Sequence, residues 1–502
     1  MKIFSTDQVR EWDNATISKE SIDSINLMER AAQKCSEWLV NNIPADKKFI
    51  IFCGKGNNGG DGLAIARMLL QHDRQLRTFI LATPDSTSKD FSVNLQRLEK
   101  LAGDIERIET EKQFPQIDPD SVVVDALFGY GLNRPLLSLT ASLVNHINRH
   151  SSLTISIDMP SGLFADKSSK GGVVINATHT LTFQTMKLAF LLPENGSYVG
   201  DIHVLDIGLD KDYYNNTPCR FEISEPELIS SFHRPRNKFS HKGNYGDAAL
   251  VVGSYGMMGA AVLSARACLR TGAGKLTCYI PACGFSILQT AIPEAMCVMD
   301  ENEKFLTKLS LKRSYEVYGI GPGMGQQDIS AGVLEELFLS AKGPVVIDAD
   351  ALNILSARKD LYEFIPANSI LTPHPKEFER LFGGSSNDFE RLELALEKAR
   401  ALKVFIVLKG HYSFIAMPEG RGFFNPTGNA GMATPGSGDV LTGILTGLLA
   451  QGYGAVQTAL AGVYLHGLAG DIAAEEWSQE AMMAGDICNA MPAAIKKIFY
   501  RQ

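Results

Sequence analysis

Short apolar runs alternate with longer amphipathic stretches from residue 49 to residue 208 of the chain. Six runs are rich in β-branched and aromatic residues: FIIFC (49–53), RTFILA (77–82), SVVVDALF (121–128), LTISID (153–158), THTLTF (178–183) and IHVLDIG (202–208). Helical spacing predicts helices from Leu63 to His72 and from Phe91 to Ala102. About six strands with intervening helices are typical of a parallel, doubly wound α/β sheet that is covered on both faces.

A second alternating series starts at Asp247. Its predicted strands are AALVVGS (248–254), KLTCYIP (275–281), YEVYGIGPG (315–323), PVVIDAD (344–350), NSILTPHP (368–375) and VFIVLKG (404–410). A helix rich in small residues is expected at 256–272, and two apolar, Gly- and Ala-rich helices near the end must pack against close neighbours. The polar segment between the two series has no sustained period. We therefore predict domains at 1–222 and 241–502, joined by a linker at 223–240.

Composition narrows the class of protein. With 502 residues, 45% hydrophobic and 21% charged, the chain is long enough for two large folded domains. The 48 basic and 56 acidic residues give a net charge of −8, which argues against coating a nucleic acid. The longest apolar run, Val440 to Ala450, is shorter than the roughly 20 residues that span a bilayer. We expect a cytoplasmic protein with no membrane or nucleic-acid partner.

The start of the chain and its cysteines narrow the class of protein further. Ser5 and Gln8 have the spacing of a capping box, so the first residues predict a helix start rather than a signal peptide. The eight cysteines include no C-x-x-C pair, which argues against a zinc ribbon or a disulfide framework.

A glycine-rich loop, GKGNNGGDG at 54–62, follows the first strand and opens a helix. It contains G-x-G-x-x-G, so its amides and the helix N-terminus could receive a diphosphate. The second strand, however, ends in Thr83 and Pro84 and lacks the acidic residue that would bind a ribose. An ordinary hydride-transferring dehydrogenase is therefore disfavoured.

Polar side chains stand at the ends of three predicted strands: the Asn57–Asp61 loop, Asp125 and Asp158. Any one Asp could be a helix N-cap, but the carboxyl ends of parallel strands share one edge, so together they predict a site. Oxygen ligands from Asn58, Asp125 and Ser161 would suit a hard cation.

With VDALFGYGLNRP at 124–135 and IDMPSG at 157–162, this loop resembles the NAD(P)H-hydrate epimerase domain over nearly all of residues 1–220. The resemblance implies that Asp158 is the acid/base and that Asn58, Asp125 and Ser161 hold potassium. Epimerising C6 of the hydrated nicotinamide breaks and remakes a bond to oxygen, which needs a proton relay and no redox centre. The implied substrate contacts are Asn57, Asn58, Gly59, Gly60, Asp61, Gly129, Tyr130, Gly131, Leu132, Asn133, Arg134, Pro135 and Asp158.

The second domain carries an anion-binding sequence, NAGMATPGSGD at 429–439, directly before an apolar helix. Gly436, Ser437 and Gly438 at the helix start would aim free amides at a transferring phosphate. Asp439 beside them could take a proton from an attacking hydroxyl, although a loop-capping role is the alternative.

The G-x-G-D sequence resembles the ribokinase-like superfamily. IGPGMG, DADALN, TPHPKEFERL, LKG and NAGMATPGSGDVLTG together resemble its ADP- or ATP-dependent NAD(P)H-hydrate dehydratases over about 241–502, with Ser254 in place of an expected Gly. The resemblance implies that Asp439 is the catalytic base and that magnesium binds together with ADP or ATP. Implied substrate contacts are Gly323, His374, Pro375, Lys376, Glu377, Phe378, Glu379, Arg380 and Asp439. Implied ADP contacts are Lys409, Gly410, His411, Tyr412, Ser413, Asn429, Ala430, Gly431, Met432, Ala433, Thr434, Pro435, Gly436, Ser437 and Gly438.

The two resemblances fit one reaction sequence. The expected fold is an amino-terminal Rossmann-like doubly wound sheet followed by a ribokinase-like α/β domain. The expected function is a bifunctional repair enzyme that epimerises R and S hydrates of NADH or NADPH and dehydrates the S form at the expense of ADP or ATP. Two alternatives stay open: a small-alcohol kinase with a regulatory first domain, and a first domain that only binds nucleotide or protein. The apolar helices of the second domain are consistent with a homo-oligomer.

Overall fold

The computed structural model of the chain describes residues 1–82, 86–101, 104–309, 311 and 314–500. Thr83, Pro84 and Ala102, on which the sequence analysis drew, lie outside these residues. The chain divides into two compact units. The amino-terminal unit comprises Lys2–Cys219 with Asn387–Phe389, and the carboxyl-terminal unit comprises Met1, Arg220–Ser386 and Glu390–Gln502.

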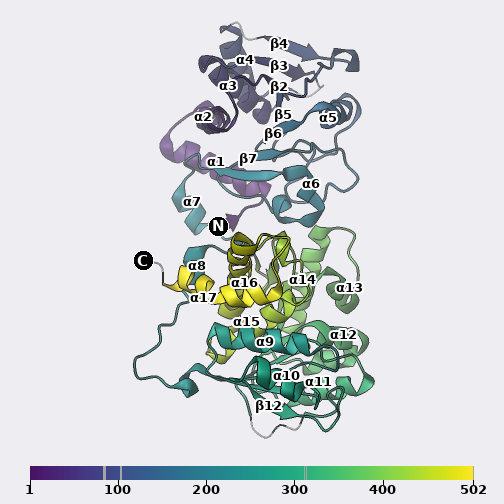
Figure 1. Cartoon of the computed structure of the whole chain (residues 1–502). Helices are drawn as coiled ribbons and strands as arrows, with labels where there is room; N and C mark the ends of the chain where they lie inside the picture. Colours follow the sequence, from purple (N-terminus) through teal and green to yellow (C-terminus); the bar gives the residue numbers. More distant parts are fainter. Residues whose placement is uncertain (83–85, 102–103, 310, 312–313, 501–502) are drawn as a thin grey trace. The chain divides into compact units, whose positions relative to one another are not determined.

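The amino-terminal unit is built on a seven-stranded parallel sheet of described residues, in the order β4-β3-β2-β5-β6-β7-β8 (Figure 1). Its elements are β1 (Lys2–Ile3), α1 (Thr6–Glu20), α2 (Ser24–Asn42), β2 (Phe49–Cys53), α3 (Asn57–Gln71), β3 (Leu76–Leu81), α4 (Lys89–Glu99), β4 (Ile105–Ile108), β5 (Val122–Ala126), α5 (Ser138–His150), β6 (Leu153–Ile157), β7 (His179–Phe183), α6 (Gly196–Val199), β8 (Asp201–Leu205) and α7 (Lys211–Asn216). The six predicted strands are all present. The seventh, β4, was missed because its sequence, IERI, has two central charged residues that are exposed.

Alternate residues of the central strand β2 face two separate cores. Phe49, Ile51 and Cys53 pack with apolar residues of α2, α3 and α4, whereas Ile50 and Phe52 pack with apolar residues of α5. Figure 1 shows α2 and α3 on one side of this sheet and α5 on the other. Both faces are therefore covered, which explains why the strands are continuously apolar rather than alternating.

Helix α1 begins where the capping-box spacing predicts. The Ser5 hydroxyl accepts a hydrogen bond from the Gln8 amide at 3.3 Å, and the Gln8 side chain accepts one from the Ser5 amide at 3.1 Å. The cap satisfies two amides and starts the helix at Thr6, so that Trp12 is buried and Asp13 faces the pocket described below.

The carboxyl-terminal unit has its strands in the order β9-β18-β17-β16-β15-β14-β13-β10-β11-β12. Its elements are β9 (Phe221–Ile223), α8 (Pro226–Ser230), β10 (Asp247–Val251), α9 (Met258–Thr271), β11 (Lys275–Ile280), α10 (Gly284–Ala291), β12 (Met296–Met299), β13 (Val317–Ile320), α11 (Asp328–Ser340), β14 (Val345–Ile347), α12 (Ala349–Ala357), β15 (Ile370–Leu371), α13 (Pro375–Phe382), α14 (Asp388–Leu402), β16 (Phe405–Leu408), β17 (Phe414–Ala416), β18 (Gly422–Phe424), α15 (Ser437–Ala450), α16 (Ala455–Trp477) and α17 (Ala484–Phe499).

All six strands predicted for this second unit are present and pair in parallel. The three-residue strands β17 and β18 pair antiparallel beyond β16 and were missed, as was β12. Part of the segment expected to be a linker is also folded, because β9 ends at Ile223, α8 lies within the segment, and Ile229 is fully buried in the core of this unit.

The two small-residue helices α9 and α15 pack closely. A Cβ at Gly443 would lie 2.2 Å from the Ser264 carbonyl oxygen, and one at Gly447 would lie 2.7 Å from the Cys268 carbonyl oxygen. Only glycine permits the two backbones to come this close, so Gly443 and Gly447 determine how α15 packs against α9. The first turn of α15 carries Asp439, which this packing places.

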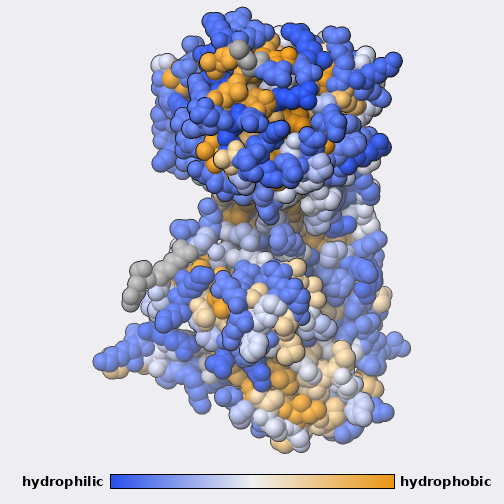
Figure 2. Space-filling view, turned by 45° about the horizontal axis from the view of Figure 1, so that its top comes forward, coloured by the Kyte–Doolittle hydropathy of each residue, from blue (hydrophilic) through white to orange (hydrophobic). Residues whose placement is uncertain are grey.

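No helix among the described residues is both long enough and apolar enough to cross a membrane. Figure 2 shows one face of the molecule, on which hydrophilic residues predominate and apolar residues form separate groups.

Candidate active sites

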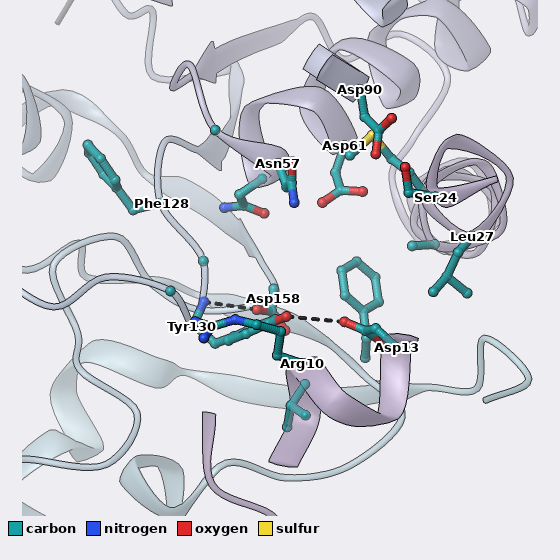
Figure 3. A pocket seen from close by; sticks show the side chains of 18 of the residues that line it. Arg10, Asp13, Ser24, Leu27, Asn57, Asp61, Asp90, Phe128, Tyr130 and Asp158 are labelled. Atoms are coloured by element: carbon teal, nitrogen blue, oxygen red, sulfur yellow. Dashed lines mark hydrogen bonds between the residues drawn. The ribbon is translucent and has the colours of Figure 1, made fainter. Parts of the chain in front are cut away.

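A pocket of about 740 Å³ lies at the carboxyl ends of the strands in the amino-terminal unit (Figure 3). Predicted residues that line it are Asn57, Asn58, Asp61, Gly129, Tyr130, Gly131, Leu132, Asn133, Arg134 and Asp158. Gly59, Gly60 and Pro135 are not among the described lining residues. Groups that are up to about a hundred residues apart in sequence therefore share one cavity, as the parallel sheet requires.

Two glycines of the first loop are needed for backbone packing. A Cβ at Gly54 would lie 2.0 Å from the Leu127 carbonyl oxygen, and one at Gly59 would lie 1.8 Å from the carbonyl oxygen of Gly54. The loop thus folds back on itself beside the end of β5. This close approach brings Asn58 and Asp61 to the pocket.

Asp158 occupies a strained backbone position directly after β6. Its φ of 64° lies in the left-handed region, which a residue other than glycine, asparagine or aspartate seldom adopts. Its carboxylate accepts hydrogen bonds from the Tyr130 amide at 3.1 Å and from the Lys187 ammonium at 2.7 Å. Such strain at a cavity wall is typical of a residue whose side chain must point in one direction.

Lys187 is a functional residue that the sequence analysis missed. It lies just beyond β7, is 2% exposed, and donates from Nζ to Asp158 Oδ1 at 2.7 Å and to Thr182 Oγ1 at 2.7 Å. A buried ammonium requires such partners. The available signal was one lysine inside the apolar sequence MKLAFLLP, which points to a buried charge with a specific partner.

Asp13, on helix α1, was also missed. It lines the pocket, and its carboxylate accepts a hydrogen bond from the Tyr130 hydroxyl at 3.1 Å (Figure 3). Burial raises the pKa of Asp13 to about 6, with a smaller contribution from Asp158, although the Tyr130 hydrogen bond opposes the rise. Burial, together with Asp158 and Asp13, raises the pKa of Asp61 well above its ordinary value.

The predicted cation ligands Asn58, Asp125 and Ser161 differ in how their polar atoms are used. The Asp125 carboxylate is fully buried and accepts from the Ser161 hydroxyl at 2.6 Å, the Ser161 amide at 2.8 Å and the Ser156 hydroxyl at 2.8 Å. Burial raises the pKa of Asp125 despite these bonds. Both polar atoms of the Asn58 side chain are buried, and neither has a hydrogen-bond partner among the described residues. Such an orphaned amide needs a further partner.

The anion-binding sequence of the second unit opens helix α15 as expected. Gly436 precedes the helix with a φ of 93°, and Asp439 lies in the first turn. Burial raises the pKa of Asp439 to about 7; Asp348 raises it further, whereas Lys409 opposes the rise. A carboxyl group with this pKa exchanges its proton near neutral pH, as a general base should.

Lys409 and Asp348, which was not predicted, form an ion pair beside this loop. The Lys409 ammonium lies 2.9 Å from Asp348 Oδ1 and 3.8 Å from Glu377 Oε2. Thr442 on α15 donates to Asp348 Oδ2 at 2.8 Å. Burial lowers the pKa of Lys409, but Asp348 and Glu377 outweigh it and raise the pKa. Asp348 directly follows β14. It belongs to the DADALN sequence on which the family resemblance rests, but the resemblance gave it no role.

His374 caps helix α13. Its Nδ1 accepts from the amides of Lys376 at 3.1 Å and Glu377 at 3.3 Å, while the Glu377 carboxylate accepts from the His374 amide at 2.8 Å. Burial lowers the pKa of His374. One ring nitrogen is therefore engaged locally, which leaves Nε2, 3.5 Å from Glu377 Oε1, for other contacts.

Further polar groups of this unit are held by local hydrogen bonds. Ser254, the departure from the family pattern, donates to the Gly323 carbonyl at 2.7 Å and so holds that loop. The Asn429 side chain donates to Asp471 at 3.0 Å and accepts from the Gly431 amide at 3.0 Å. The Ser437 hydroxyl lies 3.3 Å from Nε2 of His466, whose pKa burial lowers to about 4.

Together, the two units define a class of protein: a two-domain α/β enzyme with an acid–base pocket in one unit and a phosphate-transfer loop in the other. The family described as YjeF-related protein N-terminus matches residues 24–189, and the family described as NAD(P)H-hydrate dehydratase matches residues 248–493. The chain belongs to the family of bifunctional NAD(P)H-hydrate repair enzymes.

Relatives match over the full length of the chain. The bifunctional NAD(P)H-hydrate repair enzyme Nnr of Moorella thermoacetica is 35% identical over 99% of this chain and 97% of its own. The enzyme of that name from Escherichia coli is 31% identical over 97% and 93%, respectively. A crystal structure of the ADP/ATP-dependent NAD(P)H-hydrate dehydratase from Bacillus subtilis, co-crystallised with ATP and Mg²⁺, is 33% identical over 55% of this chain and 98% of its own, with a TM-score of 0.51. The predicted fold class is confirmed.

Proposed function

We propose that this chain repairs hydrated nicotinamide cofactors in two steps. The amino-terminal unit epimerises the R and S hydrates of NADH or NADPH, and the carboxyl-terminal unit dehydrates the S form with ADP or ATP. Full-length likeness to enzymes named for this repair supports the assignment. The observation that carries it is the pairing of a buried acid–base pocket with an anion loop that ends in an Asp of raised pKa.

In the epimerase pocket, we assign proton transfer to Asp158. Lys187 at 2.7 Å pairs with the carboxylate and orients it, and the Tyr130 amide fixes its second oxygen. The predicted lining residues would hold the hydrated nucleotide, with the loop at 57–61 on one side and the loop at 129–135 on the other. A module that only binds nucleotide would not need this buried ion pair, which disfavours the binding-only alternative.

Potassium is the proposed metal of the first unit, and the donor set fits it. Asn58 offers an amide oxygen with no hydrogen-bond partner in the part of the chain that the structure describes, and Asp125 offers a buried carboxylate beside the Ser161 hydroxyl. Oxygen donors of this kind suit a hard cation. Bound there, potassium would fix the two loops and offset phosphate charge.

In the second unit, we assign the role of general base to Asp439. It would take the proton of the C6 hydroxyl as that oxygen attacks the terminal phosphate, while the amides at 436–438 stabilise the transferring group. The loops at 409–413 and 429–438 would hold the adenine nucleotide, and Gly323 with 374–380 the hydrated nicotinamide nucleotide. Lys409, which lies between Asp348 and Glu377, would be a cation beside the phosphates.

Magnesium is proposed to enter with the adenine nucleotide. No group of three or more His, Cys, Asp or Glu side chains has metal-binding geometry in the described part of the chain. That agrees with magnesium, which commonly takes one or two carboxylates together with substrate phosphates and water. The ATP and Mg²⁺ in the Bacillus subtilis structure support the same view.

Location and assembly complete the proposal. Eight free cysteines support a reducing, cytoplasmic setting. Exposed apolar side chains on α10 and the edge strand β12, among them Phe285, Ile287, Met296 and Met299, support self-association through that face. Domain limits of 1–222 and 241–502 remain our assignment for the two activities. Sedimentation of the wild type and of Met299→Glu tests the assembly: a monomeric wild type would refute it.

The direct test is repair itself. A mixture of R and S NADH hydrates is incubated with the protein and ADP or ATP, and the absorbance of regenerated dihydronicotinamide is followed. Consumption of both epimers supports the proposal. Phosphorylation of a small alcohol with no action on either hydrate would favour the kinase alternative instead.

A further inference from the structure

The epimerase pocket contains a second carboxyl group whose placement is independent of the β-sheet. Asp13 comes from helix α1, whereas Asp158 ends β6, and Tyr130 connects the two by separate hydrogen bonds from its amide and its hydroxyl. Figure 3 shows Asp13, Tyr130 and Asp158 along one wall of the pocket, with Asp61 and Asp90 across from them. The pair thus presents two carboxyl groups to the same side of a bound substrate.

We propose that Asp13 is the proton donor of the epimerisation and that it works with Asp158 as the base. This inference rests on the proposed epimerase function and adds a second group to it. The charges favour these roles: Asp158 is paired with the buried Lys187 ammonium, whereas the hydrogen bond that Asp13 accepts within the described part of the chain comes from the neutral Tyr130 phenol. The raised pKa of Asp13, about 6, agrees with a group that keeps a proton more readily than an ordinary carboxyl.

Two carboxyl groups on one wall of the pocket can each exchange a proton with one of two atoms bonded to C6. At C6 of the hydrate these atoms are the hydroxyl oxygen and the ring nitrogen N1. Asp158 takes the hydroxyl proton as the C6–O bond becomes a carbonyl, the C6–N1 bond breaks with its electron pair on N1, and N1 takes the Asp13 proton. The resulting aldehyde turns about C5–C6. N1 then closes on the opposite face of the carbonyl and returns its proton to Asp13, while Asp158 returns its proton to oxygen.

This sequence is balanced and restores both side chains. No electron is gained or lost, no water is consumed, and each carboxyl group ends in its starting protonation state. The alternative, loss and re-addition of water at C6, would use a group on the opposite wall, where Asp61 lies, and the fate of the hydroxyl oxygen distinguishes the two routes. The inferred route replaces the sequence-based expectation of a remade carbon–oxygen bond, because here that bond is retained and the carbon–nitrogen bond is remade.

The test compares Asp13→Asn with Glu11→Gln, a matched acid-to-amide change on the exposed face of the same helix, where Glu11 accepts from Tyr213. Interconversion of separated R and S NADH hydrates is measured without ADP. Asp13→Asn should lower the rate roughly 10²-fold or more, in the range of general acid catalysis, and Glu11→Gln should leave it unchanged. Dehydration of the S hydrate by the same preparations reports that the chain is folded.

Two further measurements separate proton donation from a structural role. In water enriched in ¹⁸O, the epimerised hydrate should keep its oxygen. For the wild type, kcat/KM should fall as pH rises through about 6, and Tyr130→Phe should move that fall to higher pH because it removes a hydrogen bond that lowers the pKa of Asp13. The Asp13→Asn variant should show no fall in kcat/KM near pH 6. Charged or titratable groups that face Asp13 are Tyr130, Asp158, Lys187 and Asp61, with Arg10 beside Tyr130.

Each result has a defined meaning. Near wild-type interconversion by Asp13→Asn, or entry of one solvent oxygen with every epimerisation, would overturn the inference while the epimerase function stands. A wild-type protein that does not interconvert the epimers at all would overturn the proposed function itself.

Discussion

Replacing Asp439 by Asn tests the dehydratase mechanism most directly. The change keeps the size and polarity of the side chain but removes its ability to take a proton. We expect dehydration of the S hydrate to fall roughly 10²- to 10⁴-fold, or about 2.7 to 5.4 kcal/mol of activation free energy. Affinity for ADP should change far less, because the amides of Gly436, Ser437 and Gly438 are left in place.

The pKa of Asp439 adds a pH signature. Because burial raises this pKa to about 7, the carboxylate form is a minor species below that pH and dominates above it. Wild-type kcat/KM for the S hydrate should rise through about pH 7 with a slope near one, and the rise should be absent in the variant. The assay is steady-state absorbance of NADH at saturating ADP and Mg²⁺, across pH 5.5 to about 8.5.

The same pKa predicts an effect on stability of opposite sign. A carboxyl group whose pKa is raised in the folded state stabilises that state at low pH, and this contribution is lost as pH rises from about 4 to about 7. The Asn side chain of Asp439→Asn does not ionise, so the variant keeps its stability as pH rises. Its unfolding free energy at pH 8 should exceed that of the wild type by at most about 4 kcal/mol. Near wild-type dehydration with both ADP and ATP would refute the reasoning, whatever the stability shows.

Three further predictions concern the metals and the epimerase. Asp158→Asn should stop epimer interconversion and spare dehydration of the S hydrate, measured by chromatography of the epimers; equal rates in variant and wild type would contradict it. Lys187→Met leaves a buried carboxylate unpaired, so epimerisation should drop at least tenfold and urea unfolding should show a loss of about 3 kcal/mol; an unchanged midpoint would argue against the ion pair. Asn58→Ala should weaken the dependence of epimerisation on potassium, whereas EDTA should suppress only dehydration; loss of epimerisation in EDTA would reverse our assignment of metals.

Both sheets, and the sheet edge at which each site lies, could be predicted from local sequence patterns. Continuous apolar runs such as FIIFC mark strands buried on both faces, and β2 indeed divides its side chains between two cores. Because parallel strands share one carboxyl edge, Asp125 and Asp158 could be placed there from their positions alone. Local chemistry was equally readable where it depends on neighbours in sequence, as in the capping box at Ser5 and the anion loop before α15.

The further side chains that complete each site could be identified only once the chain was folded. Asp13 reaches the pocket from a helix outside the strand–helix alternation, and Lys187 pairs with Asp158 after a separation of 29 residues. Asp348 contacts Lys409 across 61 residues. These contacts arise from how buried elements pack, and a buried charge is recognisable as functional only when its partner is known. The pKa values of Asp13 and Asp439 are likewise properties of burial and of charges brought near by folding, which no local pattern encodes.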